Sequence, residues 1–356
     1  MATFNFAQNG YDGEVLEDLL TYTAQGNDTY KHGLIHVHTG IQHKYTIPQI
    51  QLGTIVQDNA ATPTAPATKN GISADSLGTY TFTERFLEPK DFMIYLEFNP
   101  RDYEKYWKFA QPEGPLVFRN LDPRLQAKML RLLIENKNTY IGDAIWLSAK
   151  TATAAKINKP ESQTVIGGND SFGPLKYFDG AMARLVYNVA AAAGSEEALG
   201  GKVTLAGSTA LSGGAQVETA LYTMWQQCPK QIRNNPNLRF ITSWDVWDAY
   251  DKYVTSKDFK YSDNTKVNDY RFKGKEIIPI VGLPENTIIL GVFSKGTDSN
   301  LWMGIDYAND ENIVKIDRLQ NNSELYFFQM RLKMDVNIVR PKEIVLWTNY
   351  TYTPGA

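Results

Sequence analysis

Residues 324–341 read ELYFFQMRLKMDVNIVRP and carry the most regular pattern in the 356-residue chain. Every even position from Tyr326 to Ile338 is apolar, and the odd positions from Gln329 to Asn337 are polar or charged. A period of two is typical of a half-buried strand, and here it continues well beyond the usual five or six residues. One strand over 325–339 would be roughly 50 Å long at about 3.3 Å per residue. We therefore expect a thin, extended subunit that reaches across an assembly.

The composition excludes several classes of protein. Hydrophobic residues make up 43% of the chain, which is typical of a globular protein and not of a disordered one. The formal net charge is −3, so we expect only weak contact with nucleic acid. Cys228 is the only cysteine, which excludes an internal disulfide and predicts folding in a reducing cytoplasm. The longest apolar run, Ala181–Ala193, is too short to span a bilayer, so no membrane partner is expected.

The segment 46–100 is expected to form an extended β-hairpin. Strand-like residues begin at Ile47 and return from Tyr80 to Phe98, and residues 57–78 between them are rich in Ala, Thr, Pro and Gly. Loops longer than about 12–15 residues are uncommon in compact domains and are usually functional or disordered. We predict that this tip contacts a neighbouring subunit, with an ordinary surface loop as the alternative. The predicted contact residues are Pro63, Pro66, Lys69, Asn70 and Gly71.

Helix signals follow the hairpin. Asp122-Pro123 has the residue types that favour the first turn of a helix, and apolar residues at helical spacing extend the prediction to 122–149. A helix of this length usually lies across a sheet, so we call it the spine helix. A second helix is predicted from Val217 to about Cys228, before Pro229.

A third helix is predicted after Ser243. Its aromatic residues Trp244, Trp247 and Tyr250 recur every three positions, which favours one stripe facing the core over a ligand platform. Residues 186–215 are dominated by small side chains and are expected to form a loose connection. The mixture of helices and strands does not alternate regularly, so the predicted class is α+β. Further strands are predicted at 238–242, 277–281, 287–293, 301–306 and 313–317.

Histidines are confined to one short segment, from His32 to His43. His36 and His38 would face one side of a strand and resemble the His-x-His pair of barrel metallohydrolases. Those sites need further imidazoles from later strands, and the chain has no histidine after His43. A metal-dependent hydrolase that uses His36 and His38 therefore stays only as the alternative from another class of protein, and no catalytic residue or cofactor is predicted.

The order of these parts resembles the major capsid proteins of tailed double-stranded DNA bacteriophages, which share the Hong Kong 97 fold. The resemblance is most specific over 217–340. It rests on the helix from Val217, on NPNLRFITSWDVWDAYDKYV at 235–254, on FKGKEIIPIVGLPENTIILGVF at 272–293 and on MRLKMDVNIVRPKEIV at 330–345.

The resemblance implies a division of the chain into four parts. An N-terminal arm would cover 1–45, and the extended hairpin (the E-loop) would cover 46–100. A peripheral domain would combine 101–180, including the spine helix, with 325–356. An axial domain would cover 181–324.

A function in assembly is also implied by the resemblance. The chain is expected to form the hexamers and pentamers of an icosahedral head that encloses double-stranded DNA. Some members of the family carry a scaffolding segment ahead of the arm, whereas some 45 residues precede the hairpin here, so the resemblance implies a separate scaffolding protein, with removal of a segment ahead of residue 1 as the alternative. Portal and other head proteins are expected as well. The expected location is the virion, assembled in the cytoplasm of a bacterial host. An encapsulin-type cargo shell of the same fold is the alternative.

Some capsid proteins of this family form a covalent link from a hairpin lysine to an asparagine of a neighbour. Lys69 is the only lysine between Gly53 and Pro89, and it stands beside Asn70-Gly71. The resemblance makes Lys69 a candidate for such a link, with a solvated lysine at the tip as the alternative.

Overall fold

The structure is a computed structural model of the chain. It describes residues 28–52, 80–99, 133, 137–158, 176–192, 195, 197–203, 211, 213–256, 271–306, 315–320 and 325–353. Asp122-Pro123 and the hairpin tip at 57–78 lie outside the described residues.

The long strand predicted at 325–339 is confirmed as β13, Tyr326–Ile338. It pairs antiparallel with β4 (Lys90–Phe98), β11 (Leu301–Ile305) and β12 (Lys315–Arg318). The short strand β1 (His36–His38) extends this sheet by pairing parallel with β11. Three strands therefore pair along β13, and β4 comes from a segment more than 220 residues earlier in the chain.

Burial along β13 changes at its midpoint. From Tyr326 to Met330 buried and half-buried side chains alternate, as the sequence predicts. From Met334 to Ile338 every side chain is buried, including Asp335 and Asn337. The second half of the strand is therefore covered on both faces.

The predicted hairpin is confirmed in its two strands, β2 (Tyr45–Leu52) and β3 (Tyr80–Leu87). Strand β4, which the sequence analysis groups with the hairpin, pairs instead with β13 from Tyr326↔Phe98 to Met334↔Lys90. The reason is its apolar even-numbered face, because Ile94 and Phe98 join Phe328 and Met330 in one cluster.

A second sheet has six strands. Its order is β6 (Gly201–Val203), β14 (Val345–Trp347), β10 (Ile288–Val292), β7 (Leu238–Thr242), β9 (Lys275–Pro279) and β8 (Arg271–Phe272). Helices α6 (Gly214–Gln227) and α7 (Trp244–Ser256) cover one face of it, where Met224 and Tyr250 pack with Phe240. Both helices and the central strands agree with the sequence prediction.

Sheet membership differs from the expected residue ranges at two places. β11 and β12, expected within 181–324, belong to the sheet of β13, whereas β14, expected with 325–356, belongs to the six-stranded sheet. The division of the chain into four parts stays a prediction.

The loose connection predicted over 186–215 is wrong in three places that form regular structure. Residues 186–190 complete helix α5 (Ala181–Ala190), residues 201–203 form β6, which pairs parallel with β14, and residues 214–215 begin α6. At the first of these places Val186 and Asn188 are buried, so packing against the core stabilises the helix there. The short elements α2 (Asp28–Lys31), α4 (Thr151–Ala154), β5 (Ile157–Asn158) and β15 (Thr351–Tyr352) complete the described regular structure.

The described part of the spine helix is helical at 133 and over 137–147. It ends two residues before the predicted boundary, because Ser148 Oγ donates to the Phe178 carbonyl and the Lys150 amide to Asp179 Oδ1. Ile145 and Trp146 are 1% exposed and lie in one core cluster with residues of α5 and of both sheets. Two helical segments thus fill the space between the sheets.

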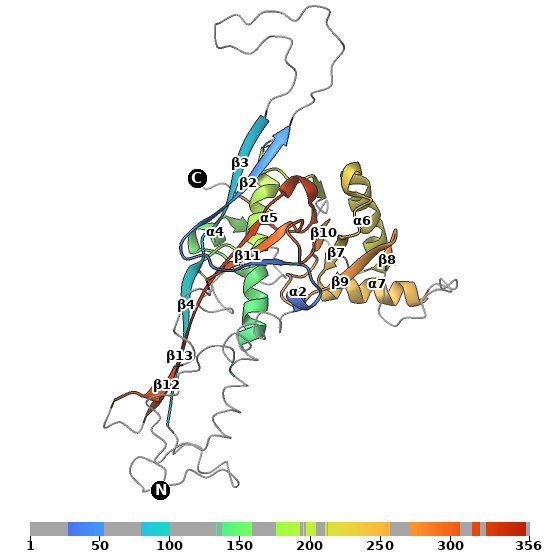
Figure 1. The fold of residues 1–356 in the computed structure, drawn as a ribbon. Helices are drawn as coiled ribbons and strands as arrows, with labels where there is room; N and C mark the ends of the chain where they lie inside the picture. The colour runs from blue at the N-terminus through green and yellow to red at the C-terminus, as the bar shows by residue number, and fades with distance from the viewer. Residues whose placement is uncertain are drawn as a thin grey trace, which may run out of the picture.

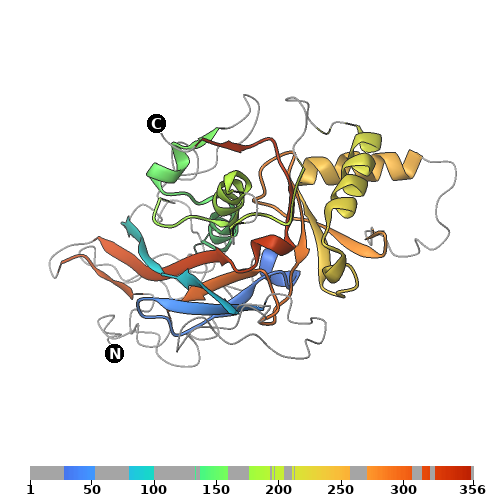
Figure 2. The same cartoon turned by 90° about the horizontal axis from the view of Figure 1, so that it is seen from above.

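The molecule is elongated. Figure 1 shows the β2–β3 hairpin projecting from one end, the ribbon of β4, β12 and β13 reaching toward the other, and the six-stranded sheet with α6 and α7 to one side. Figure 2 shows α5 on one side of the β13 sheet and the hairpin strands on the opposite side. Among the described residues, none of the helices has the length and apolarity that crossing a bilayer requires.

Candidate intersubunit surfaces

His36 and His38 serve packing in this structure. His36 Nδ1 donates to the Lys295 carbonyl at 2.8 Å, and its ring centroid lies 4.3 Å from that of Trp302. The His38 ring lies 4.1 Å from Tyr45, and burial beside His36 lowers the pKa of His38. In the part of the chain that the structure describes, no three His, Cys, Asp or Glu side chains gather as metal ligands. The described geometry gives no support to the hydrolase alternative.

The two faces of the hairpin differ in what they contact. On the inner face, Ile47 and Leu87 are buried and pack with Trp302 and Val339. The outer face is exposed along its described length and consists of Thr46, Pro48, Ile50, Phe82, Glu84 and Phe86. We call these six residues the outer hairpin face.

Two large apolar residues dominate the outer hairpin face. Ile50 is 64% exposed and Phe82 is 70% exposed, and they stand opposite each other in the β2–β3 register. A monomer gains nothing by placing such a pair in water, so this face fits a contact with another chain. The contact predicted from sequence at Pro63, Pro66, Lys69, Asn70 and Gly71 lies outside the described residues and stays a prediction.

Hydrogen bonds to β13 and to Val339, the residue after it, hold the base of the hairpin. Asn337 Nδ2 donates to the Phe86 carbonyl at 2.7 Å, and Gln49 Nε2 donates to the Val339 carbonyl. Asp335 Oδ2 accepts from the Glu88 amide at 2.8 Å. The half-buried strand expected from the alternation is therefore wrong at Asp335 and Asn337, because the hairpin base covers the face that they share.

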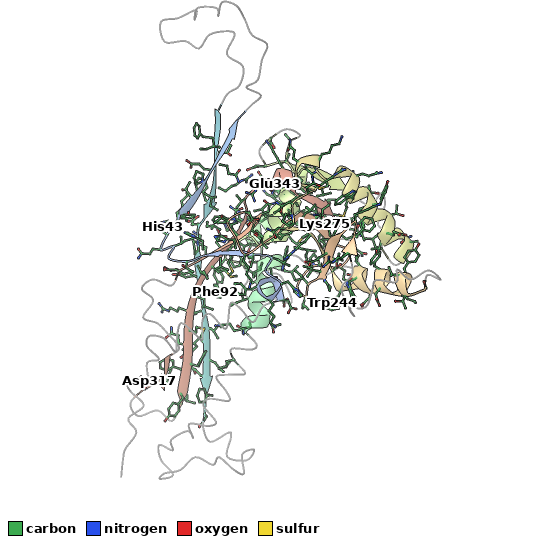
Figure 3. All side chains as sticks on the ribbon, turned by 45° about the vertical axis from the view of Figure 1, so that its right-hand side comes forward. His43, Phe92, Trp244, Lys275, Asp317 and Glu343 are labelled. Carbon is green, nitrogen blue, oxygen red and sulfur yellow. The ribbon has the colours of Figure 1, made fainter. Side chains whose placement is uncertain are left out.

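A second apolar surface lies on β4. Met93 is 59% exposed and Tyr95 44% on its odd-numbered face, Leu96 is 41% exposed on the other face, and among the described strands only β13 pairs with β4. Figure 3 shows Phe92, on the same strand, between the hairpin end and the far end of the sheet, where Asp317 is labelled. Exposed apolar side chains thus occur on both extended parts of the molecule.

The six-stranded unit exposes an aromatic side chain that the sequence analysis assigned to the core. Trp244 is 46% exposed (Figure 3), with its ring centroid 5.5 Å from that of Trp247, whereas Val246 and Tyr250 are buried. The single core-facing stripe is wrong at Trp244, because a three-residue spacing drifts about 60° per step around a helix. Two steps separate Trp244 from Tyr250, so the two side chains cannot share a narrow face.

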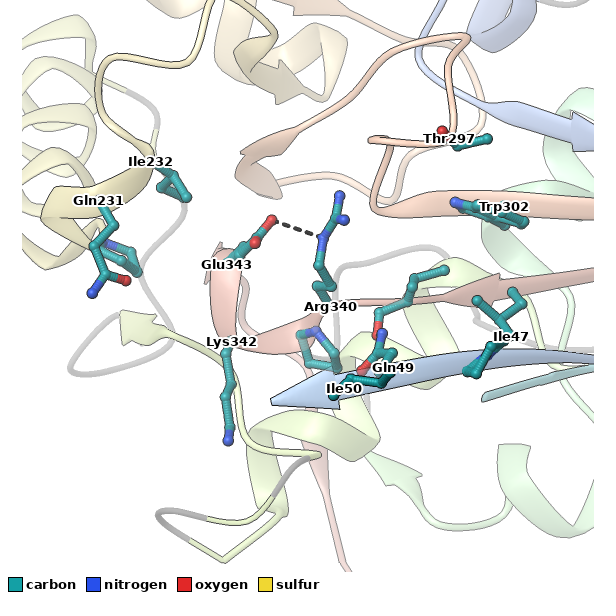
Figure 4. A pocket seen from close by; sticks show the side chains of 14 residues that line it. Ile47, Gln49, Ile50, Gln231, Ile232, Thr297, Trp302, Arg340, Lys342 and Glu343 are labelled. Carbon is teal, nitrogen blue, oxygen red and sulfur yellow. Dashed lines mark hydrogen bonds and ion pairs between the residues drawn. The ribbon is translucent and has the colours of Figure 1, made fainter. Parts of the chain in front are cut away.

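A groove of about 600 Å³ separates the hairpin base from the six-stranded unit (Figure 4). Ile47–Ile50 form one wall, and Val339–Glu343 with Gln231 and Ile232 form another. Arg340 Nε donates to Glu343 Oε2 at 3.1 Å and to Asn300 Oδ1 at 3.0 Å. This ion pair is engaged within the chain, so we assign no chemistry to the groove.

Comparison with known proteins gives matches in structure alone. No family model matches the sequence, and no curated protein matches it. A chain from the procapsid of satellite phage P4, which includes the size determination protein Sid, matches with a TM-score of 0.56, 12% identity and coverage of 96% of this chain and 93% of that chain. A capsid chain of the native GTA particle matches with a TM-score of 0.57, 12% identity and coverage of 93% and 91%. A capsid chain of cyanophage A-1(L) matches with a TM-score of 0.51, 12% identity and coverage of 91% and 93%.

The chain has a Hong Kong 97-like capsid fold. The α+β class and the fold expected from the resemblance are both confirmed. Nearly the whole chain takes part in the match, so the extended hairpin and the long strand are parts of the capsid fold.

One buried cation lies beneath the long sheet of this capsid fold. Lys137, at the start of the helical segment 137–147, is 5% exposed, and its Nζ lies 3.3 Å from Met330 Sδ on β13. Burial lowers the pKa of Lys137 to about 7. The charged form is therefore disfavoured where the helix meets the sheet.

Replacement of Lys137 by Met is expected to flatten the pH dependence of stability. The folded-state pKa is about 7 and the ordinary value is 10.5, so between these values the unfolded chain binds more protons than the folded one. The free energy of unfolding should therefore rise with pH across this window, and the rise should disappear in Lys137→Met. Denaturant unfolding of the soluble subunit from pH 7 to 10 measures it, with Lys252→Met on the exposed face of α7 as the control. Equal slopes in the wild type and in Lys137→Met would contradict the assignment.

Proposed function

We propose that this chain is the major capsid protein of a tailed double-stranded DNA bacteriophage. The observation that carries the proposal is the outer hairpin face, where Ile50 and Phe82 are 64% and 70% exposed while the base of the same hairpin is anchored by buried contacts. A rigidly based projection with an apolar outer surface suits a protein that is completed by copies of itself. The capsid fold, matched over more than nine-tenths of this chain and of capsid chains from a native GTA particle and cyanophage A-1(L), supports this reading.

Self-assembly would take the form of hexamers and pentamers in an icosahedral head. Closed symmetric assembly buries the same surface on every copy, and it stabilises each subunit by mass action. The apolar side chains on β4 and the exposed Trp244 offer further contact surfaces at separate places on the molecule. A separate scaffolding protein, a portal and other head proteins belong to the same proposal.

The packaged double-stranded DNA would be contacted weakly. The chain has 36 Lys and Arg against 39 Asp and Glu, so cations are not in excess to neutralise phosphates. A lumen without strong positive charge lets DNA be packed and later released. The place of function would be the virion, with assembly in the host cytoplasm.

A structural role without catalysis completes the proposal. His36 donates to a backbone carbonyl and stacks near Trp302, and the Arg340–Glu343 pair in the groove is engaged. These groups act within the fold, and none of them is poised toward an open site.

Expression of the full chain, alone and with its neighbouring head genes, tests the proposal. We expect closed particles or capsomers by electron microscopy, and DNA inside mature particles that resists nuclease. Particles that hold a protein cargo and no DNA would favour the encapsulin-type shell. A stable monomer that turns over a small molecule would overturn the capsid proposal.

A further inference from the structure

The hairpin and the long sheet diverge at one corner, between strands β3 and β4. β3 ends at Leu87 and β4 begins at Lys90, where it pairs with Met334 of β13. Glu88 and the proline after it form the corner between the two strands. The direction in which the hairpin leaves the body is therefore set by what holds this corner.

Asp335 holds the corner from the neighbouring strand. It follows Met334 on β13, one residue beyond the end of the β4 pairing. Its Oδ2 accepts from the Glu88 amide at 2.8 Å, and its Oδ1 accepts from Arg184 Nη2 at 3.1 Å. Arg184 belongs to α5 and also donates from Nε to the Asp179 carbonyl at 3.0 Å. One carboxylate thus joins the corner, the long strand and the helix beneath it.

Packing around the corner leaves the hairpin little freedom to slide. Leu87 is 0% exposed and lies over β11 at Gly304, the residue paired with Asp335. A Cβ on Gly304 would lie 3.2 Å from Leu87 Cβ and 2.8 Å from Ile41 Cδ1, so the absence of a side chain permits this close approach. Leu87 therefore lies at the pivot, and the contact at Glu88, together with those of Asn337 and Gln49, restricts the angle about it.

Stability alone does not account for a carboxylate at this position. The Asp335 side chain is 5% exposed, and desolvation raises its pKa although Arg184 opposes the shift. The folded state therefore disfavours the ionised form, and stability falls as pH rises from the ordinary pKa of Asp to the raised one. Buried ion pairs are often no more stabilising than apolar residues of the same size, but their hydrogen bonds have a direction.

We propose that Asp335, oriented by Arg184, is the positioning residue that sets the angle between the hairpin and the body of the subunit. The effect on the single subunit stands on the contacts alone. Its consequence for assembly rests on the proposed function: a hairpin free to swing presents its outer face to a neighbour over a range of angles, and the resulting shells vary in curvature and diameter.

Hydrogen exchange on the full-length soluble subunit tests the positioning role. In Asp335→Asn an NH2 group, which donates, replaces one of the two carboxylate oxygens. The side chain then cannot accept hydrogen bonds from both Arg184 and the Glu88 amide. We expect amides in peptides covering 82–92 to exchange roughly tenfold faster or more, which corresponds to the loss of one charge-assisted hydrogen bond. Amides of β7 and β10 in the second sheet should keep their wild-type rates.

Asp306→Asn is the matched control. Asp306 is another buried carboxylate at this sheet, with a side chain 7% exposed and Oδ2 3.0 Å from Lys333 Nζ. Lys333 Nζ also lies 3.8 Å from Asp91 Oδ1, so the two variants are compared over 82–90, which leaves Asp91 out. Equal acceleration over 82–90 in both variants would mean general destabilisation and would overturn the proposal, as would unchanged exchange in Asp335→Asn. If Asp335→Asn does not fold, Arg184→Gln tests the same contact from a half-exposed side chain and must give the same local acceleration.

Electron microscopy of particles then tests the consequence. Asp335→Asn should give a wider distribution of diameters than Asp306→Asn. If the particle diameters of Asp335→Asn are distributed as in the wild type while exchange at 82–92 is fast, the positioning role of Asp335 stands and its proposed effect on shell curvature is overturned. Failure of every variant and of the wild type to form shells would count against the proposed function and not against the positioning role.

Discussion

Replacement of Val336 by Asp is expected to abolish the soluble subunit. Val336 is 0% exposed, pairs with Met303 on β11 and lies in the cluster that joins both sheets and the two central helices. A carboxylate there would be surrounded by apolar side chains. An unpaired buried charge costs several kcal/mol or more, and the whole stability of a domain is about 5–15 kcal/mol.

The control for this prediction is Arg331→Ser on the same strand. Arg331 is exposed and stands opposite Met93, so its loss should leave yield and melting temperature close to wild type. Soluble yield and thermal unfolding followed by circular dichroism provide the measurement. Leu332 is only half-buried, which makes it a weaker test of the same face. If Val336→Asp is soluble and melts like the wild type, the assignment of the even-numbered face to the core is incorrect.

The double replacement Ile50→Asp and Phe82→Asp is expected to prevent shell closure while leaving the subunit folded. Both side chains are mostly exposed in the single chain, so a polar group there costs the isolated subunit little. In a shell the same positions would be covered by a neighbour. Burial of a large apolar side chain contributes about 1.5–3 kcal/mol, and every copy in the shell would lose this contribution twice.

Glu84→Gln is the matched control on the same face. Glu84 is exposed opposite Pro48, next to Phe82 on the same face of β3, and its replacement removes a charge while both apolar side chains remain. Particle counts by electron microscopy and the melting temperature of the subunit give the two readouts. Shells of normal number and size from the double variant would remove the outer hairpin face from the assembly contact. A large fall in subunit melting temperature would mean that the face is used within the chain.

Strand β13 shows both what the sequence pattern predicts and what it leaves undetermined. Alternation predicts the strand and its apolar even-numbered face, and both are confirmed from Tyr326 to Ile338. The same pattern gives Asp335 and Asn337 no special place, because a polar residue at an odd position looks the same whether it faces water or a buried hydrogen-bond partner. Their partners, Glu88 and Phe86, are about 250 residues away in the sequence and leave no local trace.

The errors on helices have related causes. The small side chains of 186–215 predict a loose connection, yet residues 186–190 belong to α5, where Val186 and Asn188 are buried against the core. The spacing of the aromatic residues predicts that Trp244 faces the core, yet the drift of that spacing around α7 leaves Trp244 46% exposed. Whether a small or an aromatic residue is buried depends on the surface that packs against it, and the propensity of the single residue does not describe that surface.

The α+β class, the long strand, the hairpin strands and the helices α6 and α7 could be predicted from the sequence, because each depends on a periodic pattern within a short window. The pairing of the strands, the place of β4 beside β13 and the exposed face of the hairpin could be known only from the folded chain. These depend on contacts between distant segments, whereas a local pattern records that a side chain is buried without recording what buries it. The anchoring of the hairpin at Asp335 belongs to the second group, since three separate segments must fold before its hydrogen bonds exist.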